Sequence, residues 1–298
     1  MRRQIGLIVC LVLLTPAAGF AGLTSGARIM EYPANARAFG LAEAFSALAD
    51  DAAAIHYNPA GLYAVPSYQV NTAFQKGLYD TFYSHLGFAM PLNNQAGLGV
   101  AVSYLNGGTM DLTFIDGTER QVTAQQDFLW ALACGLQVSG ENTVGLSVKI
   151  LQSTLAEEYR ALGFACDGGL KYKVMDDLTF ALVIKNLGPN LTYDQGSDPL
   201  PTSVTAGCGY RYVLAPEHRF QAALDLKKPL DLSYQLHAGV EYEFDRMFFL
   251  RAGYKYGHDL DGFTFGAGME WAFFRLDYAA GLMSELGMNH YISVLFTF

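Results

Sequence analysis

Residues 235–244 read QLHAGVEYEF. Every second side chain in this stretch is apolar, so Leu236 and Val240 share one face of an extended chain while His237 and Glu241 share the other. A period of two residues with one apolar and one polar face predicts a β-strand.

The same unit repeats from about residue 68 to the C-terminus, each time followed by a turn rich in Gly, Asn, Asp or Pro. Counting the units predicts fourteen strands, near residues 68–76, 82–90, 96–112, 125–138, 142–154, 162–174, 178–187, 201–213, 218–228, 234–244, 248–256, 262–272, 274–282 and 289–298. We therefore predict an all-β fold, a transmembrane antiparallel β-barrel of about 14 strands over residues 67–298. Its apolar face would meet lipid and its polar face would line the lumen.

The composition supports this class of protein. Only 16% of the residues are charged, against roughly 25% in an average soluble domain, while the chain holds 31 Gly, 20 Phe and 18 Tyr. The net charge of -9 argues against a nucleic-acid partner, because phosphates are bound by basic surfaces. Outside the N-terminus no apolar run approaches the roughly 20 residues that a spanning helix needs.

The N-terminus predicts a cleaved signal peptide over residues 1–21. Arg2 and Arg3 form a basic start, residues 5–14 an apolar core, and residues 19–21 a small-residue cleavage site. The mature protein would therefore be exported and, as a barrel, would lie in the bacterial outer membrane with outer-membrane lipid around it.

Turn lengths predict the orientation, since barrels of this kind have short periplasmic turns and longer external loops. The short turns are residues 139–141, 175–177, 245–247 and 272–273. The longer segments are residues 107–125, 154–161, 188–200, 229–233 and 257–261.

The last strand alternates Ile292, Val294, Phe296 and Phe298 and ends on that terminal Phe. This pattern resembles the signal that the bacterial barrel assembly machinery reads. The alternative is the final strand of a soluble β-protein that happens to end in Phe.

Residues 22–66 differ in kind, because they are rich in Ala and show no alternation. Their motifs are Gly26-Ala27-Arg28, the run from Arg37 to Ala44, Ala49-Asp50-Asp51-Ala52 and Asn58-Pro59-Ala60-Gly61-Leu62. Together with Ala223-Leu224-Asp225-Leu226 and the run from Leu250 to Lys255, this sequence resembles the PorV/PorQ family, itself related to FadL-type transporters.

The resemblance implies a fourteen-stranded barrel with residues 22–66 folded inside the lumen as a partly helical plug. The motif Asn58, Pro59, Ala60 and Gly61 would lie near the start of the first strand. Pro59 has a fixed φ and no N–H, and Asn58 can cap the backbone beside it, so both suit a turn from helix into strand.

Arg37 with Asp50 or Asp51 could hold the plug to itself or to charges of the lumen wall. The candidate wall residues are Lys149, Lys185, Arg251 and Arg275. A buried pair of this kind matters chiefly because loss of one partner costs about 3–5 kcal/mol. The alternative is that Asp50 and Asp51 only end a helix in solvent.

Two functions follow from the resemblance. The first is a role in protein secretion or surface attachment of the type IX kind, with a secretion channel or a secreted cargo as partner. The second is FadL-like uptake of hydrophobic small molecules such as long-chain fatty acids, which needs an apolar pocket and an opening in the wall at a strand kink. Leu129, Val183 and Phe249 are inward-facing candidates for that pocket, or they simply pack on the plug.

Catalysis, metals and cofactors are not indicated. The six histidines, His56, His85, His218, His237, His258 and His290, have no nucleophile or ligand at a suitable spacing. Cys134, Cys166 and Cys208 fall on apolar strand faces, where Cys acts as a small hydrophobe. Cys10 lies inside the apolar core of the signal peptide, which disfavours a lipoprotein.

Overall fold

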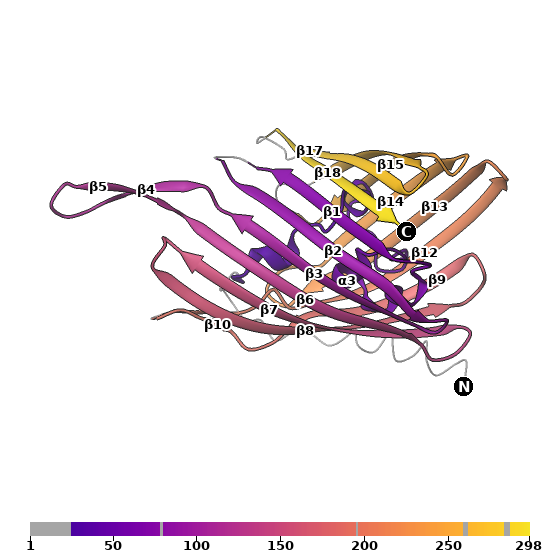
Figure 1. Ribbon diagram of the computed structural model, residues 1–298, viewed down its shortest axis with the longest axis horizontal. Coiled ribbons are helices and arrows are strands. Elements are labelled where there is room, and N and C mark those ends of the chain that lie inside the picture. The colour runs from indigo at the N-terminus through magenta and orange to yellow at the C-terminus, as the bar shows by residue number, and fades with distance from the viewer. Residues whose placement is uncertain (1–24, 78–79, 195, 259–261, 283–286) are drawn as a thin grey trace.

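The computed structural model describes residues 25–77, 80–194, 196–258, 262–282 and 287–298 (Figure 1). The predicted signal peptide, including Cys10, lies outside the described residues. Among the described residues, no helix is both long enough and apolar enough to cross a membrane.

Fourteen antiparallel strands form one closed barrel, which confirms the predicted fold. The barrel strands are β1 (Gln69–Lys76), β2 (Phe82–Asn93), β3 (Ala96–Asn106), β6 (Gln125–Gln137), β7 (Asn142–Leu155), β8 (Tyr159–Lys173), β9 (Leu178–Leu187), β12 (Ser203–Ala215), β13 (His218–Pro229), β14 (Gln235–Phe244), β15 (Phe248–Tyr256), β16 (Phe263–Trp271), β17 (Phe274–Leu282) and β18 (Met288–Thr297). Each pairs with its chain neighbour in the barrel, and the pairing of β1 with β18 closes the sheet.

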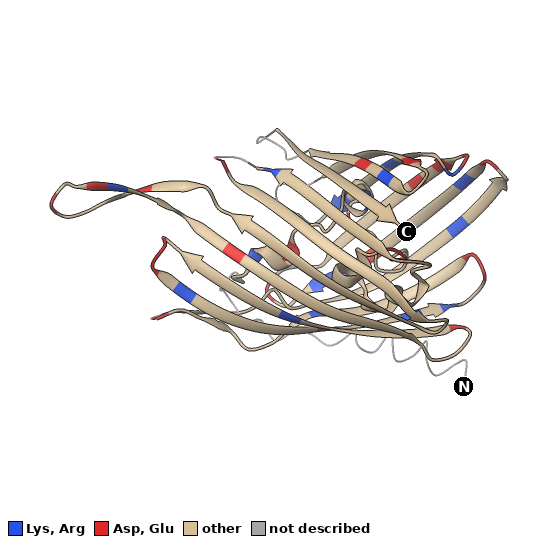
Figure 2. Ribbon diagram, viewed as in Figure 1, with Lys and Arg blue, Asp and Glu red and all other residues tan. Residues whose placement is uncertain are grey.

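The alternation read from the sequence appears in the exposure of the side chains. On β14, Val240 is 55% exposed on the outside, whereas its neighbour Glu241 is 1% exposed on the inside. On β15, Leu250 is 60% exposed and Arg251 only 4%. Charged positions are correspondingly sparse along much of the barrel wall, as Figure 2 shows. The apolar outer surface is therefore continuous, as a lipid-facing wall requires.

Aromatic side chains gather near both ends of the barrel. At the end that carries the longer connections, which we call the long-loop end, the rings of Phe82 and Tyr104 lie 5.4 Å apart and those of Tyr104 and Phe128 lie 4.6 Å apart. At the opposite, short-turn end, the rings of Tyr68 and Phe88 lie 6.3 Å apart. Two aromatic girdles are typical of barrels that meet a membrane interface at each end.

Two predicted boundaries are wrong. The strand predicted for residues 96–112 ends at Asn106, because Gly108 turns the chain at a φ of +77°. Beyond it a separate hairpin, β4 (Thr109–Thr113) and β5 (Glu119–Thr123), projects past the barrel (Figure 1).

The second wrong boundary is the loop predicted for residues 154–161. There β7 and β8 stay paired up to Leu155 and Tyr159. Ala156 and Glu157 make the turn with positive φ values of 49° and 64°. Two consecutive positive φ values are typical of a tight hairpin turn, which needs no long loop.

The N-terminal residues 25–66, which we call the luminal segment, lie inside the barrel (Figure 1). They contain four short helices, η1 (Arg28–Glu31), α2 (Ala36–Gly40), α3 (Ala54–Tyr57) and η2 (Pro59–Ala64). The segment starts at the long-loop end, where the Gly26 N–H donates to the Pro199 carbonyl at 3.1 Å. It descends through the lumen and joins β1 at the short-turn end.

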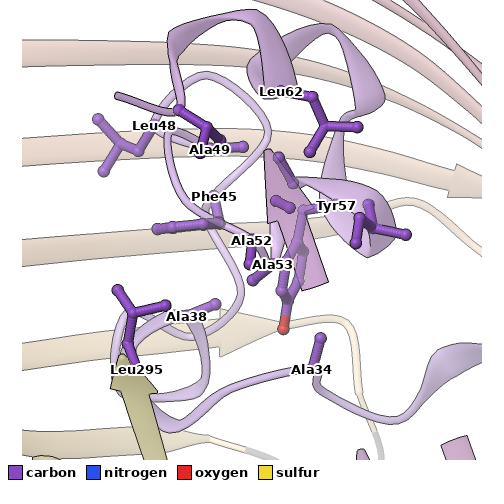
Figure 3. Packing of buried hydrophobic residues seen from close by; sticks show 14 of the residues in the cluster. Ala34, Ala38, Phe45, Leu48, Ala49, Ala52, Ala53, Tyr57, Leu62 and Leu295 are labelled. Atoms are coloured by element: carbon purple, nitrogen blue, oxygen red, sulfur yellow. The ribbon is translucent and has the colours of Figure 1, made fainter. Parts of the chain in front are cut away.

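The luminal segment has an apolar core of its own, shown in Figure 3. Phe45 and Leu48 pack with Tyr57 and Leu62 and with several alanines, and Leu295 of the wall closes the cluster. Small residues dominate, which keeps the segment narrow enough to fit within fourteen strands.

Inward-facing glycines line the wall wherever the luminal segment touches it. They are Gly97 and Gly99 of β3, Gly135 of β6, Gly145 of β7, Gly169 of β8, Gly207 and Gly209 of β12, Gly239 of β14, Gly253 of β15, Gly266 of β16 and Gly281 of β17. A Cβ on Gly135 would lie 2.6 Å from the Pro59 carbonyl oxygen, and one on Gly253 would lie 2.6 Å from the Ala42 nitrogen. The backbone of the segment therefore rests directly on the wall, which only glycine permits.

Two neighbouring glycines of β8 test this fit. A Cβ on Gly169 would meet Asn58 and Pro59 of the luminal segment, whereas a Cβ on Gly168, on the opposite face, meets nothing within 4 Å. We expect Gly169→Val to lower the free energy of unfolding in detergent by about 1–3 kcal/mol through overpacking. Gly168→Val should unfold like the wild type, and equal loss in both variants would contradict the fit.

Candidate functional site: the barrel lumen

An apolar cluster occupies the lumen at the long-loop end, and we call it the long-loop apolar cluster. Its wall residues are Tyr83, Leu105, Leu129, Leu151, Ala161, Ala165, Leu191 and Leu200. Ile29 and Met30 of η1, both 0% exposed, pack against these residues from inside the lumen. The ring of Tyr32 lies 4.8 Å from that of Tyr83 at the edge of the cluster. The lumen at this end is thus lined and filled by aliphatic and aromatic side chains.

Of the three apolar residues predicted to face inward, only Leu129 belongs to this cluster. Val183 is 1% exposed but lies elsewhere, and Phe249 packs its ring under the guanidinium groups of Arg251 and Arg275 at 5.3 and 5.9 Å. Sequence reasoning missed the other wall residues because they lie at strand ends and in a loop. A usable signal was present, since pairs such as Tyr104-Leu105 and Ile150-Leu151 interrupt the alternation with an inward apolar residue.

The barrel wall is irregular beside this cluster. Among the described residues, β8 pairs with β9 only from Cys166 to Lys173, so its first residues, 159–165, have no partner on β9. The register shifts by one extra residue on β9 between the Gly168–Ile184 and Cys166–Leu187 pairs. The connection from β9 to β12 covers this stretch with the short strands β10 (Leu191–Thr192) and β11 (Ser197–Asp198). At this point the barrel wall beside β8 is therefore formed by the β9–β12 connection and not by a strand paired with β8.

Asn186 holds the irregularity in place. It adopts a φ of +57°, a conformation that Asn tolerates better than most residues. Its side chain accepts from the Lys149 Nζ at 2.8 Å and donates to the Pro201 carbonyl at 3.0 Å, while its N–H donates to Asp167 at 2.7 Å. Its carbonyl accepts from the Thr202 hydroxyl at 2.8 Å, so all four polar groups are satisfied where the ladder breaks.

Below the long-loop apolar cluster, charged side chains lie on the inner faces of β7, β8 and β9, and on β9 they are followed by the buried Val183 and Ala181. The Lys149 Nζ lies 2.6 Å from Asp167, and both side chains are almost fully buried. The Lys185 Nζ lies 3.3 Å from the His56 Nε2 of α3. The lumen is therefore divided along its length into an apolar part and a polar part.

Four arginines and four carboxylates form one ion cluster between the luminal segment and strands β12 to β17. The arginines are Arg37, Arg211, Arg251 and Arg275, and the acids are Asp50, Asp51, Glu241 and Asp277. The structure thus brings together Arg37, Asp50, Asp51, Arg251 and Arg275, which the sequence singled out, and adds Arg211, Glu241 and Asp277. The signs balance, as a buried cluster requires.

Arg37 is the centre of the cluster. Its guanidinium contacts Asp50 at 2.8 Å, Asp51 at 3.2 Å and Glu241 at 3.2 Å, and its side chain is only 6% exposed. Burial alone would raise the pKa of the Asp50 carboxyl. The nearby charges of Arg37, Arg211 and Lys171 lower this pKa by more than burial raises it, so it lies below its ordinary value. Asp51 also accepts from the Ala53 N–H at 3.0 Å, so it caps the backbone while buried rather than in solvent.

The motif residues Asn58, Pro59, Ala60 and Gly61 lie between the luminal segment and the wall at the short-turn end. The Asn58 Nδ2 donates to the Ser46 carbonyl at 2.8 Å, and its Oδ1 accepts from the Ala60 N–H at 3.1 Å. Pro59 occupies the first position of η2, where no N–H is needed. The motif thus turns the chain just before β1 begins, while it packs against the inward-facing Gly135, Gly145 and Gly169 of the wall.

The remaining predicted residues are dispersed. The Phe298 side chain is 68% exposed at the short-turn end, and its N–H donates to the Tyr68 carbonyl at 2.9 Å. Cys134, Cys166 and Cys208 are free thiols on the outer face. Within the described ranges no three His, Cys, Asp or Glu side chains are placed to hold a metal ion.

Comparison with solved structures shows that this is the fold of FadL-type barrels. The CymD monoaromatic hydrocarbon channel is 13% identical, with 89% of this chain and 97% of that chain covered at a TM-score of 0.63. The Pseudomonas putida toluene transporter TodX is 14% identical, covering 90% and 98% at a TM-score of 0.60. A Pseudomonas aeruginosa FadL homologue is 11% identical, covering 89% and 98% at a TM-score of 0.56.

No family model matches the chain, and no curated protein matches it in sequence. The comparisons thus support the FadL side of the resemblance at the level of the fold, whereas the PorV/PorQ assignment is not shown by them.

The ion cluster yields a direct test. Arg37→Met would leave buried carboxylates short of a partner, so we expect the free energy of unfolding in detergent to fall by about 3–5 kcal/mol. Arg120→Met is the matched control, because Arg120 pairs with Glu157 on the exposed hairpin at 3.2 Å. Such surface pairs contribute roughly 0–1 kcal/mol. If both variants unfolded alike, the cluster would have no role in holding the luminal segment.

Proposed function

We propose that this protein is a bacterial outer-membrane barrel that takes up hydrophobic small molecules. The observation that carries the proposal is the long-loop apolar cluster, which lies inside the barrel and which a cargo molecule could enter by displacing Ile29 and Met30; we call this region the compartment. Small-molecule sites are mostly apolar with a few polar groups, and this compartment has that character. The likeness in fold to barrels named as toluene and monoaromatic hydrocarbon channels supports the same reading.

The compartment is best placed to receive cargo from outside. Long loops face outward in barrels of this type. The described parts of the β9–β12 connection, residues 188–194 and 196–202, contribute Leu191 and Leu200 to the apolar cluster. Ile29 and Met30 occupy part of the space, so a cargo molecule would displace them or pack beside them. The luminal segment, residues 22–66 in our prediction, acts as the plug that keeps the rest of the lumen closed.

A route out of the compartment follows from the irregular wall. Residues 159–165 of β8 lack a β9 partner next to Ala161 and Ala165 of the apolar cluster. A hydrophobic molecule could leave sideways there into the membrane without crossing the polar part of the lumen. This route is favoured because an apolar molecule in the polar part of the lumen would displace water from charged side chains, and that desolvation costs free energy.

The alternative role in secretion or surface attachment predicts different partners. Mass spectrometry of the protein purified from its own membrane would distinguish the two. A stoichiometric apolar ligand supports uptake, whereas a secretion channel or secreted cargo without such a ligand supports the PorV/PorQ role.

Two adjacent residues of β8 test the compartment. Ala161 is 5% exposed inside the apolar cluster, and Leu162 is 58% exposed on the outer face. We expect Ala161→Phe to fill the compartment and weaken binding of a hydrophobic fluorescent probe at least tenfold, which is a loss of about 1.4 kcal/mol. Leu162→Phe should leave probe affinity unchanged. Unaltered binding in a folded Ala161→Phe protein would rule out the compartment as the cargo site.

Phe298 is proposed as the assembly signal that the barrel assembly machinery reads. Its side chain is 68% exposed, and its ring is stacked on that of Phe296 with centroids 6.4 Å apart. Phe298→Ser should therefore cost little stability once folded but reduce the amount of heat-modifiable protein in the outer membrane severalfold. Normal membrane levels after this change would remove the proposed role.

A further inference from the structure

One carboxylate lies among the apolar side chains of the compartment. Asp127 of β6 is 0% exposed, and its Cα partners across the sheet are Leu105 of β3 and Ser153 of β7. The same row of paired residues continues to Tyr83 of β2 and to Ala161 of β8. Tyr83, Leu105 and Ala161 all belong to the long-loop apolar cluster. Asp127 is therefore part of the wall of the compartment.

Asp127 differs from the other buried carboxylates of the described residues. Four of these pair with a Lys or Arg: Asp51, Asp167, Glu241 and Asp277. A fifth, Asp225, accepts from two backbone N–H groups of the luminal segment. Asp127 forms no ion pair with a described residue, and its two hydrogen bonds come from the Ser153 Oγ and the Gln125 Nε2, each at 2.6 Å. The contacts that explain the other five buried carboxylates are thus missing at Asp127.

The network around Asp127 has acceptor capacity left. An ionised carboxylate has about four acceptor sites, and each oxygen of Asp127 accepts one bond from the described side chains. Ser153 donates its hydroxyl proton to Asp127, and Tyr193 donates its own to the Ser153 Oγ at 2.8 Å. Both hydroxyl protons are used, so a ligand would meet Asp127 as a hydrogen-bond acceptor.

The part of the luminal segment that a cargo molecule would displace covers the strand of Asp127. The helix η1 lies against β3 and β6, and its Ile29 and Met30 pack in the long-loop apolar cluster. Along β6, Gln125, Asp127 and Leu129 share the inner face, with Gln125 nearest the long-loop end. A molecule that replaces Ile29 and Met30 can thus place its apolar body beside Leu129 and its outer end beside Asp127.

We propose that Asp127 selects the head group of the cargo, so that the compartment prefers apolar molecules with a hydroxyl over those with a carboxylate. A hydroxyl donates its proton to Asp127 in a charge-assisted hydrogen bond. A carboxylate would bring a second negative charge beside a buried one. Given the proposed uptake function, on which this selection rests, the preferred cargo is a neutral alcohol or phenol with an apolar body. Fatty acid anions are disfavoured.

Three probes that share one apolar body test this selection: propylbenzene, para-propylphenol and para-propylbenzoate. At about pH 7 the phenol is neutral and the benzoate is ionised. Their affinities for the purified full-length protein in detergent are measured by displacement of the hydrophobic fluorescent probe. The wild type should bind the phenol at least tenfold more tightly than the benzoate. This comparison needs no substitution, and equal affinities would overturn the selection.

Asp127→Asn should lower the phenol-to-benzoate affinity ratio at least tenfold. A neutral amide accepts a weaker hydrogen bond from the phenol and does not repel the benzoate. Propylbenzene has no head group, so its affinity should stay within about twofold of the wild-type value. Equal loss of all three probes would mean that Asp127 only holds the wall together, and the selection would then be wrong.

Asp116→Asn is the matched control, because it makes the same change of net charge far from the compartment. Asp116 is exposed at the tip of the β4–β5 hairpin, where its Oδ1 accepts from the Thr118 N–H at 3.0 Å. This variant should keep the wild-type affinity ratio. A ratio that falls as far in Asp116→Asn as in Asp127→Asn would reflect net charge alone and would contradict the selection.

Ala161→Phe separates head-group selection from uptake itself, since it should weaken binding of all three probes alike. If it weakens all three while a folded Asp127→Asn protein keeps the wild-type affinity ratio, the compartment remains the cargo site and only the selection fails. If no probe binds the wild type, or if Ala161→Phe changes nothing, the compartment is not the cargo site and the proposed function fails together with the selection.

Discussion

The close contact between the luminal segment and the inner wall is the constraint on which the rest of this structure depends. The luminal segment meets the wall closely at glycines of nine of the fourteen strands, so neither side has room for a larger side chain at these contacts. The segment is correspondingly rich in Ala, and the chain as a whole holds 31 Gly. Small residues on both surfaces let fourteen strands close tightly around a folded segment.

Such a contact removes backbone groups from water, and each must find a partner. Wall side chains supply several of them. Gln69 accepts from the Ala52 N–H, Asn71 donates to the Ala34 carbonyl, and Asp225 accepts from the N–H groups of Phe45 and Ser46. Much of the polar lumen therefore serves to satisfy the luminal segment, and the ion cluster around Arg37 extends the same principle to charge.

The division of the lumen follows from where this contact ends. At the long-loop end the segment begins with Ile29 and Met30 among aliphatic side chains, so the space there is apolar. At the short-turn end between β8 and β12 the segment leaves a polar cavity. The two ends of the lumen therefore differ in polarity, because apolar side chains pack at one end and mostly polar side chains line the cavity at the other.

The sequence by itself determined the strands, their faces and the existence of a distinct N-terminal segment. Alternation is a local property, so Val240 could be assigned to the outer face and Glu241 to the inner face without knowing which strands lie beside theirs. It failed for the strand predicted over residues 96–112 and for the loop predicted over residues 154–161, where positive φ values at Gly108, Ala156 and Glu157 set the turns. The sequence identified Arg37, Asp50, Asp51 and Arg251 among its charged candidates. It did not show how their side chains pair.

Only the tertiary structure decided which side chains meet across the lumen. Glu241 and Asp277 join Arg37 and Arg251 because the strand register brings β14 and β17 to the level of α2. The long-loop apolar cluster, the unpaired start of β8 and the polar cavity arise in the same way. Each depends on register and on the path of the luminal segment, and contacts between residues more than 100 positions apart leave no periodic trace in a single sequence.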